Sequence, residues 1–248
     1  MMDATTAARL LLDARAEHTR IGDLPAPARP ANDVDSYAIQ DLVIRELGPI
    51  GGWKVGARTP ESEPNCAPLP ASLVFRSPHV FAGQFPLCIV EAEVGFTIAR
   101  DLPPRSTPYA ERDVLAALAS VHATIELLDT RLAGYPAVDA ATNLADFGAN
   151  GALVVGPART HDLRVDQPSL HLAVHCNGER VLEKTGGNTA GDVFRLLVWL
   201  ANHAAARTGG LRAGQVVTTG SCIGAYKVAP GTHVRAVFDG IPPVEATL

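Results

Sequence analysis

The sequence predicts a mixed fold in which helices come first and strands make up most of the rest. Two stretches near the N-terminus, residues 3–19 and 33–47, carry apolar side chains at helical spacing. In contrast, residues 90–98 alternate apolar and polar side chains with the period of a half-buried strand, and Asn177-Gly178 is typical of a hairpin turn. With 248 residues, 47% of them hydrophobic, the chain can bury the core of one large domain and leaves room for a smaller lobe.

Composition excludes several classes of function. The formal net charge is −5 and no basic run is present, so we expect no nucleic-acid partner. The apolar runs are short and broken by charge, so we expect no membrane span. Because the four cysteines form no CxxC pair and the N-terminus lacks a signal-peptide pattern, we expect a cytoplasmic protein with reduced thiols.

The chain divides into the following expected elements. Residues 3–19 form the first helix, three prolines between residues 25 and 30 impose an extended link, and Asp33 is the expected N-cap of a second helix that ends at Gly48-Pro49. In order, we then expect a strand at 51–56, a loop at 61–70, short strands and turns over 73–84, and a strand at 90–98. A helix that opens near Asp113 and includes Leu118 follows, and then a strand at 123–129 and a polar turn at 143–151. The rest of the chain is expected to form strands at 152–155, 163–165 and 170–174, a helix at 189–206, and strands at 215–221 and 234–238.

Three carboxylates are candidate metal ligands. Glu91 and Glu93 lie two residues apart in the 90–98 strand, so they share one face and repel each other unless something lies between them. A divalent cation with oxygen ligands is the usual solution, although spacing alone favours a solvated polar face. Glu126 sits among apolar neighbours in another expected strand, where a carboxylate is costly unless it is paired or binds a metal.

Lys54 is a candidate active-site residue. It stands between Trp53 and Val55 in a short strand bracketed by glycines. Two interpretations remain open at this point. The lysine can be an edge residue whose ammonium reaches the solvent, or it can point into a cavity as a cation or proton donor.

Six short motifs, spread over nearly the whole chain, occur in an order and at a spacing that match a known family. They are Gly52-Trp53-Lys54-Val55-Gly56, Glu91-Ala92-Glu93, Ile125-Glu126-Leu127-Leu128-Asp129-Thr130-Arg131, Ala145-Asp146 with Asn150-Gly151, Val198-Trp199-Leu200-Ala201-Asn202, and Gly214-Gln215-Val216-Val217-Thr218-Thr219-Gly220-Ser221. Each motif alone is weak, but six in register are fairly specific. Together they resemble the fumarylacetoacetate hydrolase superfamily, in its 2-keto-4-pentenoate hydratase / 2-oxo-3-hexenedioate decarboxylase branch.

The resemblance implies an α+β architecture, with a helical N-terminal part followed by a mixed β-roll of the fumarylacetoacetate hydrolase type. Residues 1–72 would form the helical lobe and residues 73–248 the metal-binding catalytic domain. The expected partner is a small 2-oxo acid. The resemblance also implies a homo-oligomer, with a complex with another pathway enzyme left open.

The resemblance further implies a set of site residues around Mg²⁺ or Mn²⁺. The metal ligands would be Glu91, Glu93 and Glu126, the proton-handling groups Lys54 and Asp146, and the substrate-binding groups Ser221, Gly220 and Asn150. Three carboxylates leave coordination positions open for the carboxylate and keto oxygens of a 2-oxo acid, which suits a Lewis-acid metal.

Two departures from the branch bear on the exact reaction. Phe147 stands where a polar residue usually follows the Ala-Asp pair, and residues 64–68 lack the acidic residue often found there. The expected activity is hydration of a 2-oxo acid such as 2-keto-4-pentenoate in the degradation of aromatic compounds. The alternatives are 2-oxo-3-hexenedioate (4-oxalocrotonate) decarboxylation, hydrolysis of an acylpyruvate, and a non-catalytic role.

Overall fold

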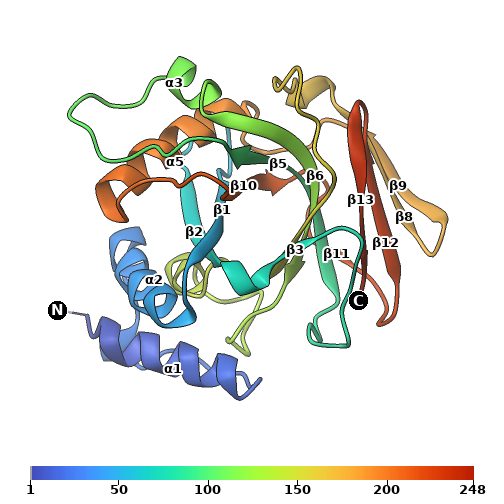
Figure 1. Ribbon diagram of the computed structural model, residues 1–248. Helices are drawn as coiled ribbons and strands as arrows, with labels where there is room; N and C mark the ends of the chain where they lie inside the picture. The colour runs from blue at the N-terminus through green and yellow to red at the C-terminus, as the bar shows by residue number, and fades with distance from the viewer. Residues whose placement is uncertain (1) are drawn as a thin grey trace.

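The computed structural model describes residues 2–248, which form a helical N-terminal part and two β-sheets (Figure 1). No helix in these residues is long and apolar enough to cross a membrane. The α-helices are α1 (Ala4–Ala16), α2 (Asp33–Leu47), α3 (Glu111–Leu115), α4 (Ala140–Ala145) and α5 (Val193–Arg207). The architecture confirms the expected α+β class.

The larger sheet holds the site, and the smaller sheet covers one of its outer faces. In the larger sheet the order is β2 (Asn65–Pro70), β1 (Ile50–Gly56), β10 (Val216–Ser221), β5 (Ile89–Ile98), β6 (Leu118–Leu128), β7 (Asn150–Val155) and β3 (Val74–Arg76), with β11 (Tyr226–Lys227) paired to β5. The smaller sheet has the order β4 (His79–Val80), β13 (Ile241–Thr247), β12 (His233–Phe238), β8 (His171–Cys176) and β9 (Glu179–Thr185). Residues 71–73 contact both β1 and β7, so the larger sheet curls back on itself as a roll.

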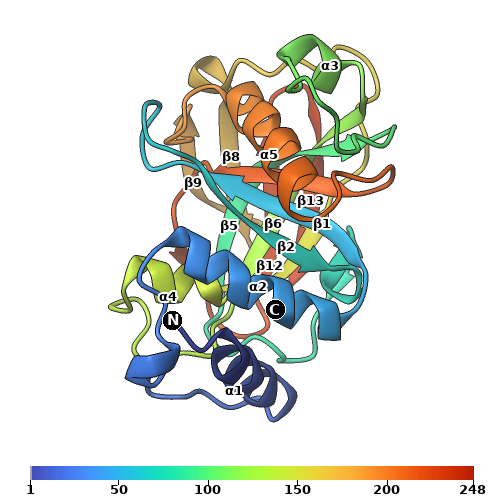
Figure 2. The same ribbon diagram turned by 90° about the vertical axis from the view of Figure 1, so that its left-hand side faces the viewer.

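The two N-terminal helices form as their sequences predict. The Asp3 carboxylate caps α1 by accepting the amide of Thr6 at 3.0 Å, and α1 then buries a stripe of alanine and leucine. The cap of α2 is Asn32, one residue before the expected Asp33, and its side chain accepts the amide of Asp35 at 3.0 Å. Helix α2 packs between α1 and β2, with α4 on its other flank (Figure 2).

The expected loop at 61–70 was wrong in its second half, because Asn65–Pro70 forms β2. Two prolines, Pro68 and Pro70, hid this strand, since proline cannot donate to a ladder. They are tolerated because β2 is the end strand of the larger sheet and needs hydrogen-bond partners only on the β1 side. Strands β1 and β2 lie before residue 72 but belong to the larger sheet. The boundary at residue 72 between a helical lobe and a catalytic domain stays a prediction.

Three other expectations were wrong. Leu118 begins β6 instead of continuing a helix, residues 163–165 form no strand, and α4 occupies part of the expected polar turn. The strand β13 was missed, because Pro242 and Pro243 interrupt its alternation of apolar and polar residues. Through β12 and β13 the smaller sheet packs on β6. Helix α5 covers β1 and β10, and the ring centroid of its Phe194 lies 5.6 Å from that of Phe96 in β5.

Candidate metal centre

Three carboxylates converge inside the roll. Strands β5 and β6 are antiparallel neighbours in a register that sets Glu91 directly opposite Glu126. Glu93 lies two residues along the same face of β5. One oxygen from each of the three side chains lies within 4.8 Å of the others. The structure therefore brings together the three residues that the sequence singled out.

The surroundings of Glu93 fix its orientation. Its Oε2 accepts a hydrogen bond from the hydroxyl of Thr218 and another from the amide of Gly220 at 2.9 Å. Gly220 has a φ of +93°, a conformation that favours glycine, and this turn at the end of β10 directs the amide at the carboxylate. Thr218 is in turn bonded to Thr124 at 3.0 Å, so β6 and β10 both support Glu93.

Glu126 is fully buried and only half satisfied. Its Oε1 accepts hydrogen bonds from Lys54 Nζ at 2.6 Å and from Asn150 Nδ2 at 2.8 Å. Its Oε2 has no hydrogen-bond partner within residues 2–248. A buried carboxylate oxygen without a partner is costly, and a cation is the partner that would satisfy it.

Burial makes Glu91 and Glu93 hard to ionise. Loss of hydration, with repulsion from Glu126, raises the pKa of Glu91 to about 7. Burial, with repulsion from Glu126 and Glu91, raises the pKa of Glu93 to about 8. A divalent cation would remove this penalty, and a set of carboxylate oxygens suits Mg²⁺ or Mn²⁺.

Lys54 points into the roll. Besides Glu126, its Nζ bonds to the carbonyl oxygen of Gly148 at 3.1 Å, and its side chain is 21% exposed. Burial disfavours the ammonium, but attraction from Glu126 and Glu91 outweighs burial and raises the pKa of Lys54. Of the two interpretations, the structure supports a cation held in the cavity.

A small cavity of about 100 Å³ opens onto these groups. Its polar lining includes Lys54, Glu91, Glu93 and Ser221. The remaining wall is mainly apolar, and is made by Val55, Cys66, Ala67, Leu144 and Phe147 together with glycines. The site is therefore a charged floor beneath an apolar wall, an arrangement that can bind a small acid and limit access of water.

Among the other expected site residues, Ser221 and Gly220 line the cavity. Asn150 does not line the cavity, and its side-chain amide donates a hydrogen bond to the Glu126 carboxylate. Asp146 does not reach the cavity. Its two carboxylate oxygens bind Arg131 Nε at 2.6 Å, and the Arg131 amide and Thr130 hydroxyl at 2.8 Å each.

Sequence reasoning missed two contributors. The hydroxyl of Thr218 supports Glu93, and the carbonyl of Gly148 holds Lys54. Alternation in β10 could have identified Thr218, because it lies on the same strand face as Gly220. No side-chain signal could have identified a backbone carbonyl. Phe147, noted as a departure, packs in the core of the helical lobe and lines the cavity.

The profile of the family described as Fumarylacetoacetate (FAA) hydrolase C-terminal matches residues 58–248, which is most of the chain. The chain belongs to the fumarylacetoacetate hydrolase family. This confirms the family that the six motifs indicated.

Relatives cover nearly the full length of the chain. The 2-keto-4-pentenoate hydratase 1 of Dechloromonas aromatica (strain RCB) is 25% identical, over 99% of this chain and 97% of that protein. The 2-keto-4-pentenoate hydratase of Burkholderia vietnamiensis (strain G4 / LMG 22486) is 28% identical, over 98% and 96%. The structure of 4-oxalocrotonate decarboxylase from Pseudomonas putida G7, complexed with magnesium and adipate, is similar with a TM-score of 0.83 and 22% identity, over 98% and 96%.

Proposed function

We propose that the protein is a divalent-metal-dependent lyase that hydrates a 2-oxo acid, such as 2-keto-4-pentenoate, in the degradation of aromatic compounds. The observation that carries the proposal is the convergence of Glu91, Glu93 and Glu126 beside Lys54, at a cavity that Lys54, Glu91 and Glu93 line. Relatives that span the chain and are named 2-keto-4-pentenoate hydratase support the choice of reaction.

The residues present fit a resident Mg²⁺ or Mn²⁺. Glu91, Glu93 and Glu126 would hold it, and the unpartnered Oε2 of Glu126 together with the raised pKa values of the other two carboxyls supports this assignment. When bound, the metal would supply Lewis acidity toward the keto oxygen of the substrate.

The chain's own groups perform the remaining tasks. Lys54 carries its proton at Nζ, where attraction from the carboxylates outweighs burial and holds it as an ammonium that can donate to the substrate and recover the proton. Ser221, whose side chain lines the cavity, can bind the substrate carboxylate. Leu144 and Phe147 limit bulk water above the site, which strengthens the electrostatic contacts below them.

Decarboxylation of 2-oxo-3-hexenedioate is the second candidate. Hydration needs a polar group that positions the attacking water, whereas decarboxylation needs mainly an electron sink and a dry pocket. The apolar wall that contains Phe147 favours the second requirement. Hydrolysis of an acylpyruvate is less well supported, because no histidine of residues 2–248 lines the cavity to serve as a base for water.

Product analysis tests the proposal. The protein with Mg²⁺, and separately with Mn²⁺, is incubated with 2-hydroxypenta-2,4-dienoate and with 2-oxo-3-hexenedioate, and the products are followed by NMR. We expect 4-hydroxy-2-oxopentanoate from the first substrate. Release of CO₂ from the second, with no product from the first, would make the decarboxylase the preferred function. No turnover of either substrate would reject both.

Three further properties belong to the proposal. A cytoplasmic location is supported by four free cysteines, three of them buried. A homo-oligomer, and a complex with another enzyme of the pathway, remain predictions. Light scattering of the purified protein tests the first, and co-purification with the enzyme that supplies the substrate tests the second.

A further inference from the structure

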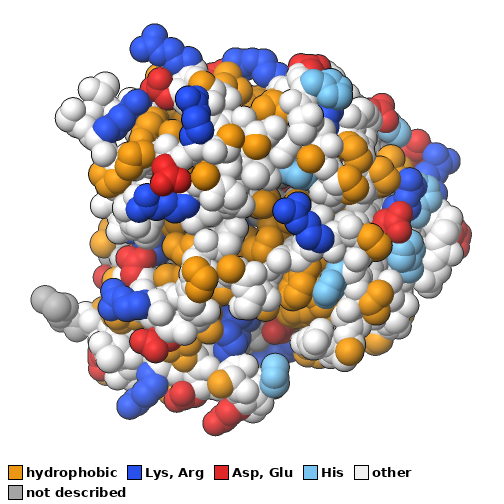
Figure 3. All heavy atoms as spheres, viewed as in Figure 1, with side chains coloured by type: hydrophobic (Ala, Val, Ile, Leu, Met, Phe, Trp, Pro, Cys, Tyr) orange, Lys and Arg blue, Asp and Glu red, His pale blue; other side chains and the backbone are white. Residues whose placement is uncertain are grey.

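A second and larger cavity lies between the helical lobe and the strands. Its volume is about 680 Å³, several times that of the metal cavity. It is lined by the end of α1 and the residues after it, by His79 and residues 81–86, and by residues 129–131, which follow β6. Figure 3 shows this recess below the centre of the face, with basic side chains in it.

Positive charge in this cavity exceeds negative charge. Three guanidinium groups line it, those of Arg15, Arg20 and Arg131. Two carboxylates are available to them: Asp129 lies 3.4 Å from Arg20 and 3.8 Å from Arg131, and Asp146 binds Arg131 at 2.6 Å. Among residues 2–248, no carboxylate forms an ion pair with Arg15.

Within the part of the chain that the structure describes, Arg15 has no counterion of its own, in an environment that disfavours its charge. Burial, with repulsion from Arg131, lowers the pKa of Arg15 to about 10. Its guanidinium carbon lies 5.6 Å from the ring centroid of Phe147, and no hydrogen bond from its side chain to residues 2–248 is present. Arg15 is only partly buried, so its guanidinium remains accessible from the cavity, and an anion bound there would supply a counterion.

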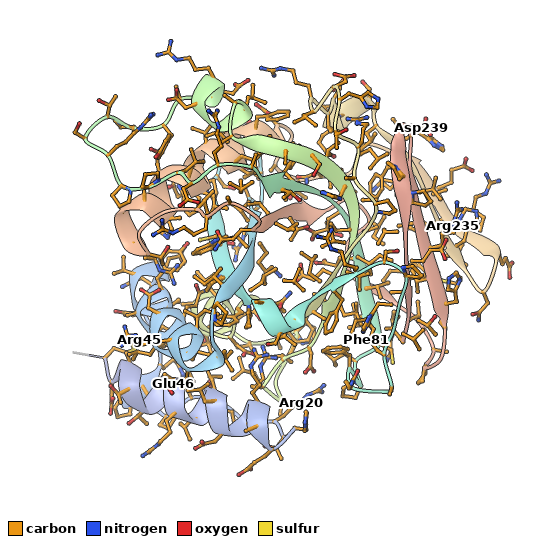
Figure 4. All side chains as sticks on the ribbon, in the orientation of Figure 1. Arg20, Arg45, Glu46, Phe81, Arg235 and Asp239 are labelled. Carbon is orange, nitrogen blue, oxygen red and sulfur yellow. The ribbon has the colours of Figure 1, made fainter. Side chains whose placement is uncertain are left out.

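The opposite wall of the cavity is aromatic. Phe81 makes edge-to-face contacts with Phe75 at 5.2 Å and with Phe85 at 5.1 Å between ring centroids. Figure 4 shows Arg20 beyond the end of α1 and Phe81 on the side of the strands. Such a wall suits a flat apolar group, because aromatic rings stack or meet edge to face at these distances.

We propose that this cavity is a second ligand site, which binds an organic carboxylate with a flat, apolar body. The carboxylate would pair with Arg15, and the body would pack on the phenylalanine wall. The site is separate from the metal cavity, because Phe147 stands between Arg15 and the space above Lys54.

Calorimetric titration of the full chain with benzoate, in the presence of Mg²⁺, tests the proposal. We expect binding to weaken about tenfold or more in Arg15→Gln, the scale of one charge-assisted contact. The matched control is Arg9→Gln, an exposed arginine on the same helix, which should bind benzoate as the wild type does. Binding should also persist in Glu126→Gln, which separates this site from the metal.

Two further arms use the wild-type protein, so the test does not depend on the folding of a variant. The neutral isostere benzamide should not bind, and inorganic phosphate should bind more weakly than benzoate because it cannot use the aromatic wall. Benzamide binding as tightly as benzoate, phosphate binding as tightly as benzoate, or loss of benzoate binding in Glu126→Gln would each overturn the proposal. The absence of benzoate binding to the wild type would also overturn it, and a changed oligomer size in Arg15→Gln would then assign the cavity to a second copy of the chain.

Discussion

Asp146 offers a sharp test of how its position in the fold decides its role. The sequence pattern made it a candidate proton-handling group, but the structure buries it against Arg131 and Thr130, outside the metal cavity. The change Asp146→Asn keeps the shape of the side chain and removes its charge. The new NH₂ group would point at hydrogen-bond donors of Arg131 or Thr130, which it cannot accept. Arg131, whose side chain is only 3% exposed, would lose its closest counterion.

The expected cost follows from this geometry. Removing one partner of a buried, hydrogen-bonded ion pair leaves the other charge uncompensated and costs about 3–5 kcal/mol of the free energy of unfolding. For a chain of this size each kcal/mol lowers Tm by about 2–4 °C. We therefore expect the Tm of Asp146→Asn to fall by roughly 6–20 °C, with Mn²⁺ affinity and turnover near the wild-type values below that temperature.

Calorimetry and urea unfolding measure the stability, and a turnover assay on the folded variant measures catalysis. The control is Glu111→Gln, which removes an exposed ion pair with Arg164 and should cost at most about 1 kcal/mol. A variant as stable as the wild type but with turnover reduced about a hundredfold would refute the structural assignment and return Asp146 to the catalytic machinery.

Three further predictions concern the metal centre. Titration calorimetry with Mn²⁺ should lose its signal in Glu91→Gln and in Glu126→Gln; unchanged affinity in both would reject the ligand assignment. Lys54→Met should fold and bind Mn²⁺ but lose turnover by about a hundredfold or more, and near-normal turnover would make the lysine structural. The third prediction concerns pH in the absence of metal. Because the pKa values of Glu91 and Glu93 are raised, the folded state binds more protons than the unfolded state between about pH 5 and pH 8. The free energy of unfolding should therefore fall as pH rises through that window. Urea unfolding in EDTA should show this fall in stability, and added Mn²⁺ should reduce the fall near pH 8. A stability that does not change with pH in EDTA, in both the wild type and Glu93→Gln, would contradict the prediction.

Local patterns were sufficient wherever the determining interaction lies within one element. The alternation in residues 90–98 put Glu91 and Glu93 on one face of β5, because the period of a strand is a property of its backbone. Likewise, the apolar spacing and polar caps near the N-terminus predicted α1 and α2 within a few residues. The isolated carboxylate of Glu126 in an apolar strand correctly indicated a residue that needs a partner.

Tertiary structure decided what depends on neighbours distant in the chain. The register of β5 and β6 sets Glu126 opposite Glu91, and nothing within either strand determines that register. The prolines of β2 were compatible with a strand only because β2 lies at the end of the sheet. Asp146 and Lys54 were both charged residues in plausible motifs. In the fold Asp146 pairs with Arg131 and Lys54 pairs with Glu126. The role of a buried charged residue therefore depends on which counterion the tertiary structure places beside it.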